Sequence, residues 1–208
     1  MTTLLARFWL FLWRWTTVTP QQPVPDKCVM IAAPHTTNWD FPITLAMARV
    51  SGVKISWLGK QSLFKGPMGP IMRRLGGVAI DRSAPGGMVA ALAAQFAERE
   101  RLVLVVPAEG TRSRTEYWKS GFYRIAEQAR VPIVLAFVDR ATRSGGFGPV
   151  ITVTGNVAAD MDAIRAFYEG KEGLRAGRFG PVRLREEDAD SAGAADLTRP
   201  RTSGTAEA

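Results

Sequence analysis

Continuous apolar runs alternate with amphipathic stretches along most of the chain. The runs predict strands at 29–33, 55–58, 77–80, 102–106, 133–138 and 150–154. The stretches between them predict helices at 40–52, 85–100, 121–129 and 160–168, with a shorter helix inside 62–75. Strands without polar positions are typical of sheets buried on both faces. The pattern therefore predicts an α/β fold, with a mixed, mostly parallel sheet that helices cover on both faces.

The pattern changes at both ends of the chain, which suggests three regions. We expect an amphipathic N-terminal helix over 1–16, a folded domain over 17–184 that begins with a Pro-rich connector, and a disordered acidic tail over 185–208. The helix would place Leu4, Phe8, Phe11, Leu12 and Trp15 on one face. Its uncharged apolar run is far shorter than the ~20 residues of a membrane span. Two interpretations stay open: a helix that lies in the lipid headgroup layer, or a helix that packs on the core.

Composition limits the functions that remain. With 208 residues, 46% of them hydrophobic, the chain can bury a core of its own. Its one Cys and one His exclude an intrachain disulfide, a cysteine-built zinc site and a two-histidine metal centre. The net charge of +8 indicates an anionic partner: nucleic acid, an anionic membrane surface or a phosphorylated substrate.

The single histidine lies five residues before an aspartate, in the sequence PHTTNWD. This spacing does not place two side chains on one helix face. It does suit a histidine in a turn, followed by an aspartate that caps the next helix and curls back toward the imidazole. A carboxylate that orients an imidazole makes a general base. We therefore expect His35 and Asp40 to act as a catalytic pair.

Three further polar clusters follow predicted strands or precede a helix. Arg82 follows the strand at 77–80 and suits a phosphate. The loop after 102–106 carries Glu109, Gly110, Thr111 and Arg112, and Lys119 precedes the helix at 121–129. Ligands of open α/β sheets bind outside the carboxyl ends of the strands. A base and several cations at that edge suit deprotonation of a hydroxyl on a phosphorylated substrate.

The order of these clusters resembles the glycerolipid acyltransferase family, which includes the lysophosphatidic-acid acyltransferases. The matching elements are the HxxxxD motif His35–Asp40, Gly77–Arg82, Glu109–Arg112 and Val131–Val134, within about residues 27–138. The resemblance implies a glycerol-phosphate-acyltransferase-like fold. It also implies that His35 deprotonates an acceptor hydroxyl while Asp40 orients it, with direct attack on a thioester and no acyl-enzyme.

The resemblance implies the substrates as well. Arg82 and Arg112 would hold an acceptor phosphate, Glu109 to Thr111 would shape the pocket, and Lys119 would add a cation. The donor would be acyl-CoA or acyl carrier protein, and no cofactor would be needed. The expected acceptor is a lysophospholipid, with 1-acyl-glycerol-3-phosphate as the first choice, which would give phosphatidic acid. Glycerol-3-phosphate, an amino-acid lipid or a hydroxylated secondary metabolite are alternative acceptors. We expect peripheral binding at the cytoplasmic face of a membrane.

Other interpretations remain at this stage. Cys28 is a candidate nucleophile, although a cysteine at the start of an apolar strand is usually buried and inert. The resemblance implies no metal, and the sequence alone leaves open a magnesium ion on Asp40, Asp81 and Glu109. A non-catalytic nucleic-acid-binding module is a third class. It would require aromatic residues interleaved with basic ones, whereas Trp9, Trp13 and Trp15 gather at the N-terminus. We therefore expect no nucleic-acid partner.

Overall fold

A single sheet forms the centre of the fold in the computed structural model, which describes residues 2–80 and 87–188. Within these residues, seven strands pair in the order β1-β7-β6-β2-β5-β3-β4. They are β1 (Thr16–Val18), β2 (Lys27–Ala33), β3 (Ile55–Lys60), β4 (Gly77–Ile80), β5 (Leu102–Val106), β6 (Ile133–Asp139) and β7 (Ser144–Ile151). Neighbours are parallel except β6 and β7, which are antiparallel. The predicted mixed, mostly parallel sheet is confirmed.

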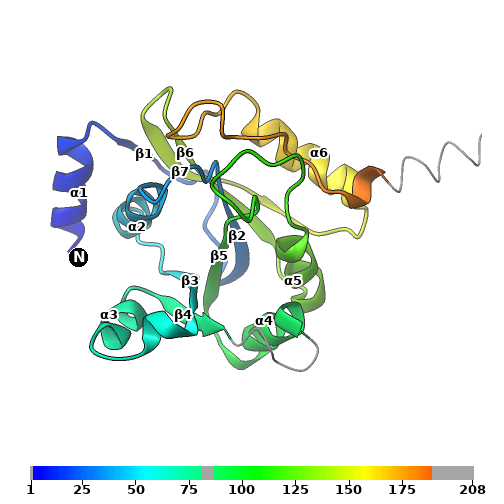
Figure 1. The fold of residues 1–208 in the computed structure, drawn as a ribbon, viewed down its shortest axis with the longest axis horizontal. Helices are drawn as coiled ribbons and strands as arrows, with labels where there is room; N and C mark the ends of the chain where they lie inside the picture. The colour runs from blue at the N-terminus through cyan, green and yellow to red at the C-terminus, as the bar shows by residue number, and fades with distance from the viewer. Residues whose placement is uncertain (1, 81–86, 189–208) are drawn as a thin grey trace, which may run out of the picture.

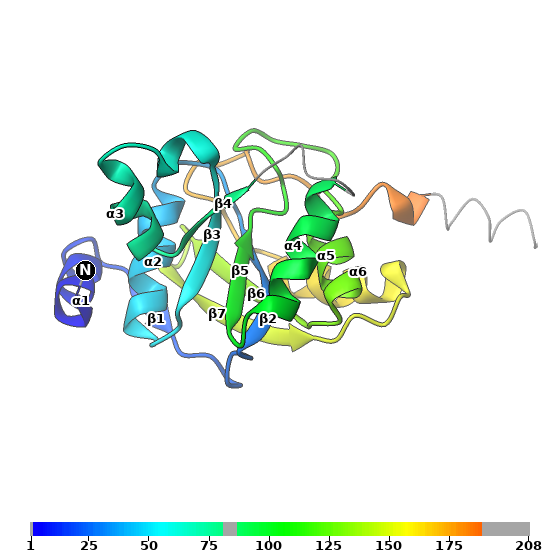
Figure 2. The same cartoon turned by 90° about the horizontal axis from the view of Figure 1, so that it is seen from below.

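Helices cover both faces of this sheet (Figures 1 and 2). They are α1 (Thr3–Leu12), α2 (Asp40–Val50), η1 (Gln61–Phe64), α3 (Met68–Arg74), α4 (Gly87–Glu98), α5 (Gly121–Ala129) and α6 (Val157–Tyr168). Both views show α1 and α2 on one side, and α4, α5 and α6 on the other. The short η1–α3 segment lies beside β3 and β4 at the sheet's edge.

The central strand β2 shows how the sequence divides the core. Val29, Ile31 and Ala33 pack with α4, α5 and α6. Cys28 and Met30, which alternate with them, pack on the opposite face with Ala48 of α2. Successive strand residues point to opposite faces, so a strand buried on both must be apolar at every position.

Two strands at one edge of the sheet differ from the prediction. The expected connector contributes β1, a three-residue strand parallel to β7. The last strand is Ser144–Ile151 rather than 150–154. Its glycines argue against a strand in sequence, but two of them are required by close packing. A Cβ on Gly145 would lie 2.5 Å from Met47 Sδ, and one on Gly146 would lie 2.3 Å from the Val18 carbonyl oxygen.

The N-terminal helix packs on the domain, as one of the two interpretations expects, but only along a narrow face. A narrow face formed by Ala6 and Leu10 is buried against Ile43, Ala46 and Met47 of α2. The wider apolar face is exposed: Leu4, Leu5, Phe8, Phe11, Leu12 and Trp13 are all more than half accessible to solvent. Packing thus fixes α1 on the domain while it leaves most of its large apolar side chains unburied.

The C-terminal segment is packed further than the sequence suggested. Val182 and Leu184 are buried, and Leu184 pairs with Trp118. Beyond the expected domain end, Glu186 binds Arg124 at 2.9 Å and Glu187 binds Arg165 at 2.5 Å. The described, packed chain therefore continues to Asp188, and residues 189–208 of the expected tail lie outside the described residues.

Candidate active site

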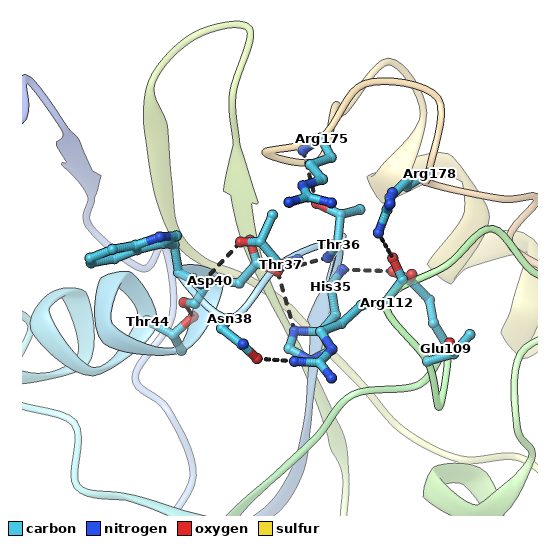
Figure 3. Close-up of polar contacts among 12 residues, drawn as sticks. His35, Thr36, Thr37, Asn38, Asp40, Thr44, Glu109, Arg112, Arg175 and Arg178 are labelled. Atoms are coloured by element: carbon cyan, nitrogen blue, oxygen red, sulfur yellow. Dashed lines mark hydrogen bonds and ion pairs between the residues drawn. The ribbon is translucent and has the colours of Figure 1, made fainter.

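Two loops meet at the carboxyl ends of neighbouring strands. β2 leads into the turn that carries His35, and β5 leads into the loop that carries Glu109 and Arg112. Since β2 and β5 are paired in parallel, both loops leave the same edge of the sheet. Figure 3 shows side chains from both loops gathered around the turn 35–40.

The predicted catalytic pair is in place. His35 Nδ1 lies 3.3 Å from Asp40 Oδ2, and the aspartate is nearly buried while about a quarter of the imidazole is exposed. The same Oδ2 accepts hydrogen bonds from the backbone N–H groups of Thr36 (2.7 Å) and Thr37 (2.6 Å). These donors hold the carboxylate against the turn, so it can orient the imidazole through Nδ1 and leave Nε2 for a substrate.

The aspartate reaches this position differently from the prediction. Asp40 is the first residue of α2 rather than its N-cap; Trp39 occupies the cap and makes no capping bond through its side chain. The carboxylate curls back to the turn as expected, because the free amides there are stronger partners than the start of the helix.

Glu109 lies behind the turn that carries His35. It is 1% exposed, and its Oε1 accepts a hydrogen bond from the backbone N–H of His35 at 2.7 Å. Burial raises the pKa of Glu109 to about 7, although the bond from His35 works in the opposite direction. Glu109 therefore positions the histidine turn. Its Oε2 is buried without a hydrogen-bond partner among the described residues.

The rest of the Glu109 loop reaches the surface. Gly110 has φ +68°, and a Cβ there would lie 2.7 Å from Cγ of Lys119, so the lysine stem runs across the glycine. This contact places Lys119, whose side chain is exposed, at the edge of the loop. Thr111 is exposed as well and accepts a bond from the Ser113 N–H.

Arg112 joins the two loops. Its guanidinium donates to Asn38 Oδ1, within the turn that carries His35. The guanidinium is exposed and has no ion pair with a residue that the structure describes. The prediction that Arg112 and His35 lie at the same edge of the sheet agrees with this geometry. The other predicted phosphate ligand, Arg82, lies outside the described residues.

A cavity of about 470 Å³ opens beside His35 and Asp40. His35, Asn38 and Asp40 line its polar end. The remaining wall is largely apolar and includes Phe41, Trp57, Leu58, Val105 and Phe137. A pocket with this division can bury a hydrocarbon chain and hold its reactive end at the histidine.

A second cavity, of about 880 Å³, lies between α2 and the amino ends of β3 and β5. Ile55 lines both cavities and is 8% exposed. Five cationic residues line the far cavity: Arg49, Lys54, Arg73, Arg74 and Arg101. Ile55 thus separates the apolar pocket at His35 from a larger, basic space.

Sequence reasoning missed several residues that complete the site. Thr36, in the turn itself, is buried, and its Oγ1 accepts a hydrogen bond from the backbone N–H of Arg175 at 3.1 Å. Arg178 donates to the Arg112 carbonyl at 3.5 Å. Both arginines come from the segment after α6, which Figure 3 shows above the turn. A contact across 139 positions leaves no signal in sequence spacing.

The structure also bears on the other candidates. Cys28 is fully buried at the amino end of β2, and burial raises its pKa to about 12, so it cannot act beside His35. Among residues 2–80 and 87–188, no three His, Cys, Asp or Glu side chains are grouped to hold a metal ion. No helix in this described part is long and apolar enough to span a bilayer.

Comparison with known proteins gives two matches. A sequence model of the acyltransferase family matches residues 16–138, which include both site loops. The fold is similar to the crystal structure of the 1-acyl-sn-glycerophosphate acyltransferase PlsC from Thermotoga maritima. That match has a TM-score of 0.53 and 14% sequence identity, and it covers 97% of this chain and 80% of the other. No curated protein sequence matches the chain.

Proposed function

Because this chain belongs to the acyltransferase family, we propose that it moves a fatty acyl group from a thioester donor to the hydroxyl of a lysophospholipid. The observation that carries this proposal is the His35–Asp40 pair at the mouth of an apolar cavity, beside exposed arginines. The proposed acceptor is 1-acyl-glycerol-3-phosphate and the product phosphatidic acid. This choice is supported by the exposed Arg112 beside the turn and by the activity for which the Thermotoga maritima structural neighbour is named.

The proposed reaction uses the chain's own groups and no cofactor. His35 Nε2 takes the proton of the acceptor hydroxyl, and Asp40 stabilises the resulting imidazolium through Nδ1. The alkoxide oxygen attacks the thioester carbonyl carbon, and the C–S bond breaks. The thiolate of CoA or acyl carrier protein leaves and recovers the proton from the imidazolium, so His35 returns to its starting state without an acyl-enzyme.

The apolar cavity would receive the donor's acyl chain. Its aromatic and aliphatic wall includes Phe41, which follows Asp40, and Ile55. A chain that enters there would leave its thioester at the mouth, within reach of an alkoxide formed at His35. Fixed placement of the two reacting groups removes a large entropic part of the barrier.

We further propose that the enzyme works at the surface of a membrane, on the cytoplasmic side where thioester donors are available. Two exposed apolar groups support this: Leu4, Phe8 and Phe11 on α1, and Leu63, Met68 and Ile71 on η1–α3. Arg7 and Lys65 are exposed within the same two segments. Apolar side chains flanked by cations are typical of surfaces that bind anionic lipid.

Vesicle binding tests the membrane part. The variant Leu4→Ser/Phe8→Ser/Phe11→Ser should bind anionic vesicles at least tenfold more weakly, since each lost apolar group contributes about 1.5–3 kcal/mol when fully buried. Its control is Val18→Ser, which removes an exposed apolar residue of β1. Equal vesicle binding by both variants would contradict docking through α1.

An acceptor panel tests the reaction. Labelled acyl-CoA and acyl carrier protein would each be offered with 1-acyl-glycerol-3-phosphate, other lysophospholipids, glycerol-3-phosphate and monoacylglycerol. The proposal predicts the highest kcat/KM with 1-acyl-glycerol-3-phosphate. Transfer to glycerol-3-phosphate alone would identify that compound as the acceptor instead. The absence of transfer to any lysophospholipid would contradict the proposal.

A further inference from the structure

The segment Gly170–Gly180 lies over the catalytic turn, although it falls outside the part of the chain that matches the acyltransferase family. Two backbone contacts fix it there. The Glu172 N–H donates to Asp139 Oδ1 at 3.0 Å, at the end of β6. The Arg175 N–H donates to Thr36 Oγ1 at 3.1 Å, next to His35. The backbone of the segment is therefore tied to two strands that form the site.

Close packing reinforces this placement. Gly173 is buried against Thr36, and a Cβ on it would lie 2.4 Å from Thr36 Cγ2, closer than two carbon atoms can approach. On the other side, Arg114 of the Glu109 loop donates to the Phe179 carbonyl at 2.8 Å. The segment is thus held between the histidine turn and the arginine loop, which fixes the starting points of its side chains.

Four arginines gather around this junction: Arg112, Arg114, Arg175 and Arg178. None of them forms an ion pair with a residue that the structure describes. Three acids of the surrounding loops have other partners: Glu109 accepts from the His35 N–H, Glu116 pairs with Arg183, and Asp139 accepts from Ala141, Thr142 and Glu172. Like charges brought together without a counter-charge raise the free energy of the site, and an anionic ligand would relieve it.

We propose that Arg175 and Arg178 form, with Arg112, a binding site for the phosphate monoester group of a substrate. The inference rests on the proposed acyl transfer, because it assigns part of that site. The guanidinium fork suits phosphate oxygens, and the three arginines come from two segments that meet at the turn of His35. Both the acceptor, 1-acyl-glycerol-3-phosphate, and the donor, acyl-CoA, carry a phosphate monoester.

The double variant Arg175→Gln/Arg178→Gln tests this site. Gln keeps the backbone N–H that binds Thr36, so the fold of the segment should persist. The matched control is Arg99→Gln, an exposed arginine that follows α4 at the opposite edge of the sheet. The conservative variant Arg175→Lys/Arg178→Lys keeps both charges and should recover part of the lost affinity.

Calorimetry with glycerol-3-phosphate reports on the arginines without any turnover. The double variant should bind at least tenfold more weakly than wild type, because it removes two cationic donors from the site. The Arg99→Gln control should bind like wild type. Equal affinity in the double variant and the control would overturn the inference, as would a wild type that binds no phosphate monoester.

Steady-state kinetics identify the source of the phosphate. A rise of tenfold or more in KM for 1-acyl-glycerol-3-phosphate, with KM for acyl-CoA and kcat unchanged, assigns the site to the acceptor. The reverse pattern assigns it to the donor, and no change in either KM overturns the inference. If the wild type acylates no lysophospholipid, the proposed function fails, while the calorimetric difference still decides whether the arginines bind phosphate.

Discussion

The arginines of this protein behave differently in two regions. On the flank formed by α5, α6 and the C-terminal segment, they are paired with acids: Arg124 with Glu186 at 2.9 Å and Arg183 with Glu116 at 2.7 Å. At the carboxyl edge of the sheet, Arg112 and Arg175 have no ion pair with any residue in the described ranges. The same side chain therefore serves two purposes.

The difference distinguishes arginines that stabilise the fold from arginines whose charge can bind a ligand. Exposed pairs on the flank fasten the C-terminal segment to the helices, and each contributes little because water screens it. The arginines at the edge are held by neutral partners, such as Asn38 for Arg112, so their charge remains available to a ligand. Variants of the two groups should differ in which property they change: unfolding on the flank, and substrate binding at the edge.

The largest effect should come from Asp40, the acid that contacts His35 at the edge of the sheet. Asp40→Asn should lower kcat by about 10²–10⁴-fold, because the imidazolium formed in the reaction loses its charged partner. The neutral amide would also bind the Thr36 and Thr37 N–H groups more weakly. The control is Asp162→Asn, which breaks only the exposed pair with Arg165. Steady-state rates measure both; a kcat within twofold of wild type for Asp40→Asn would contradict its role.

The next effect concerns Glu109, the acid of the loop that carries Arg112. Its folded-state pKa is about 7 against a usual 4.5, so the folded protein keeps a proton that the unfolded chain releases between these values. Wild-type stability should therefore fall as pH rises through this window, relative to Glu109→Gln. The difference in unfolding free energy should reach roughly 3 kcal/mol above pH 7 and vanish below pH 4.5. Denaturant unfolding at both limits measures it; a difference that does not change with pH would contradict the buried acid.

A smaller effect should separate the two kinds of arginine directly. Arg112→Gln should raise KM for the phosphate-bearing acceptor about tenfold and leave the melting temperature unchanged. Arg183→Gln should leave KM unchanged and lower the unfolding free energy by about 0.2–1 kcal/mol. Melting curves and initial rates on both variants complete the test. If Arg112→Gln loses stability and keeps its KM, the contrast between edge and flank is wrong.

The smallest effect on the reaction is expected at Ile55, the residue that lines both cavities. Ile55→Ala should join the pocket at His35 to the larger basic space and shift the donor preference toward longer acyl chains. The lost side chain costs about 2–5 kcal/mol of stability in a well-packed core, so Ile55→Val serves as the control. Competition between acyl donors of different length measures the shift. If a folded Ile55→Ala protein keeps the wild-type preference, the acyl chain of the donor does not extend past Ile55.

Sequence predicted best the contacts that are local or set by strand order. The contact between Asp40 and His35 spans five positions, and parallel strands bring the Glu109 loop to the same edge. It could not predict β7, because Gly145 and Gly146 resemble a loop until the packing of Met47 and Val18 against them is known. Nor could it predict Arg175, whose place depends on how α6 and the following segment fold back over the sheet.

The most direct test of the account is acyl transfer by His35→Ala. The measurement uses labelled donor, 1-acyl-glycerol-3-phosphate and anionic vesicles, with vesicle binding of the variant checked in parallel. We expect a kcat at least 10²-fold lower, because the variant lacks the imidazole that takes the hydroxyl proton at the cavity mouth, while vesicle binding stays at the wild-type level. Transfer by His35→Ala at the wild-type rate would contradict the assignment of His35 as the general base.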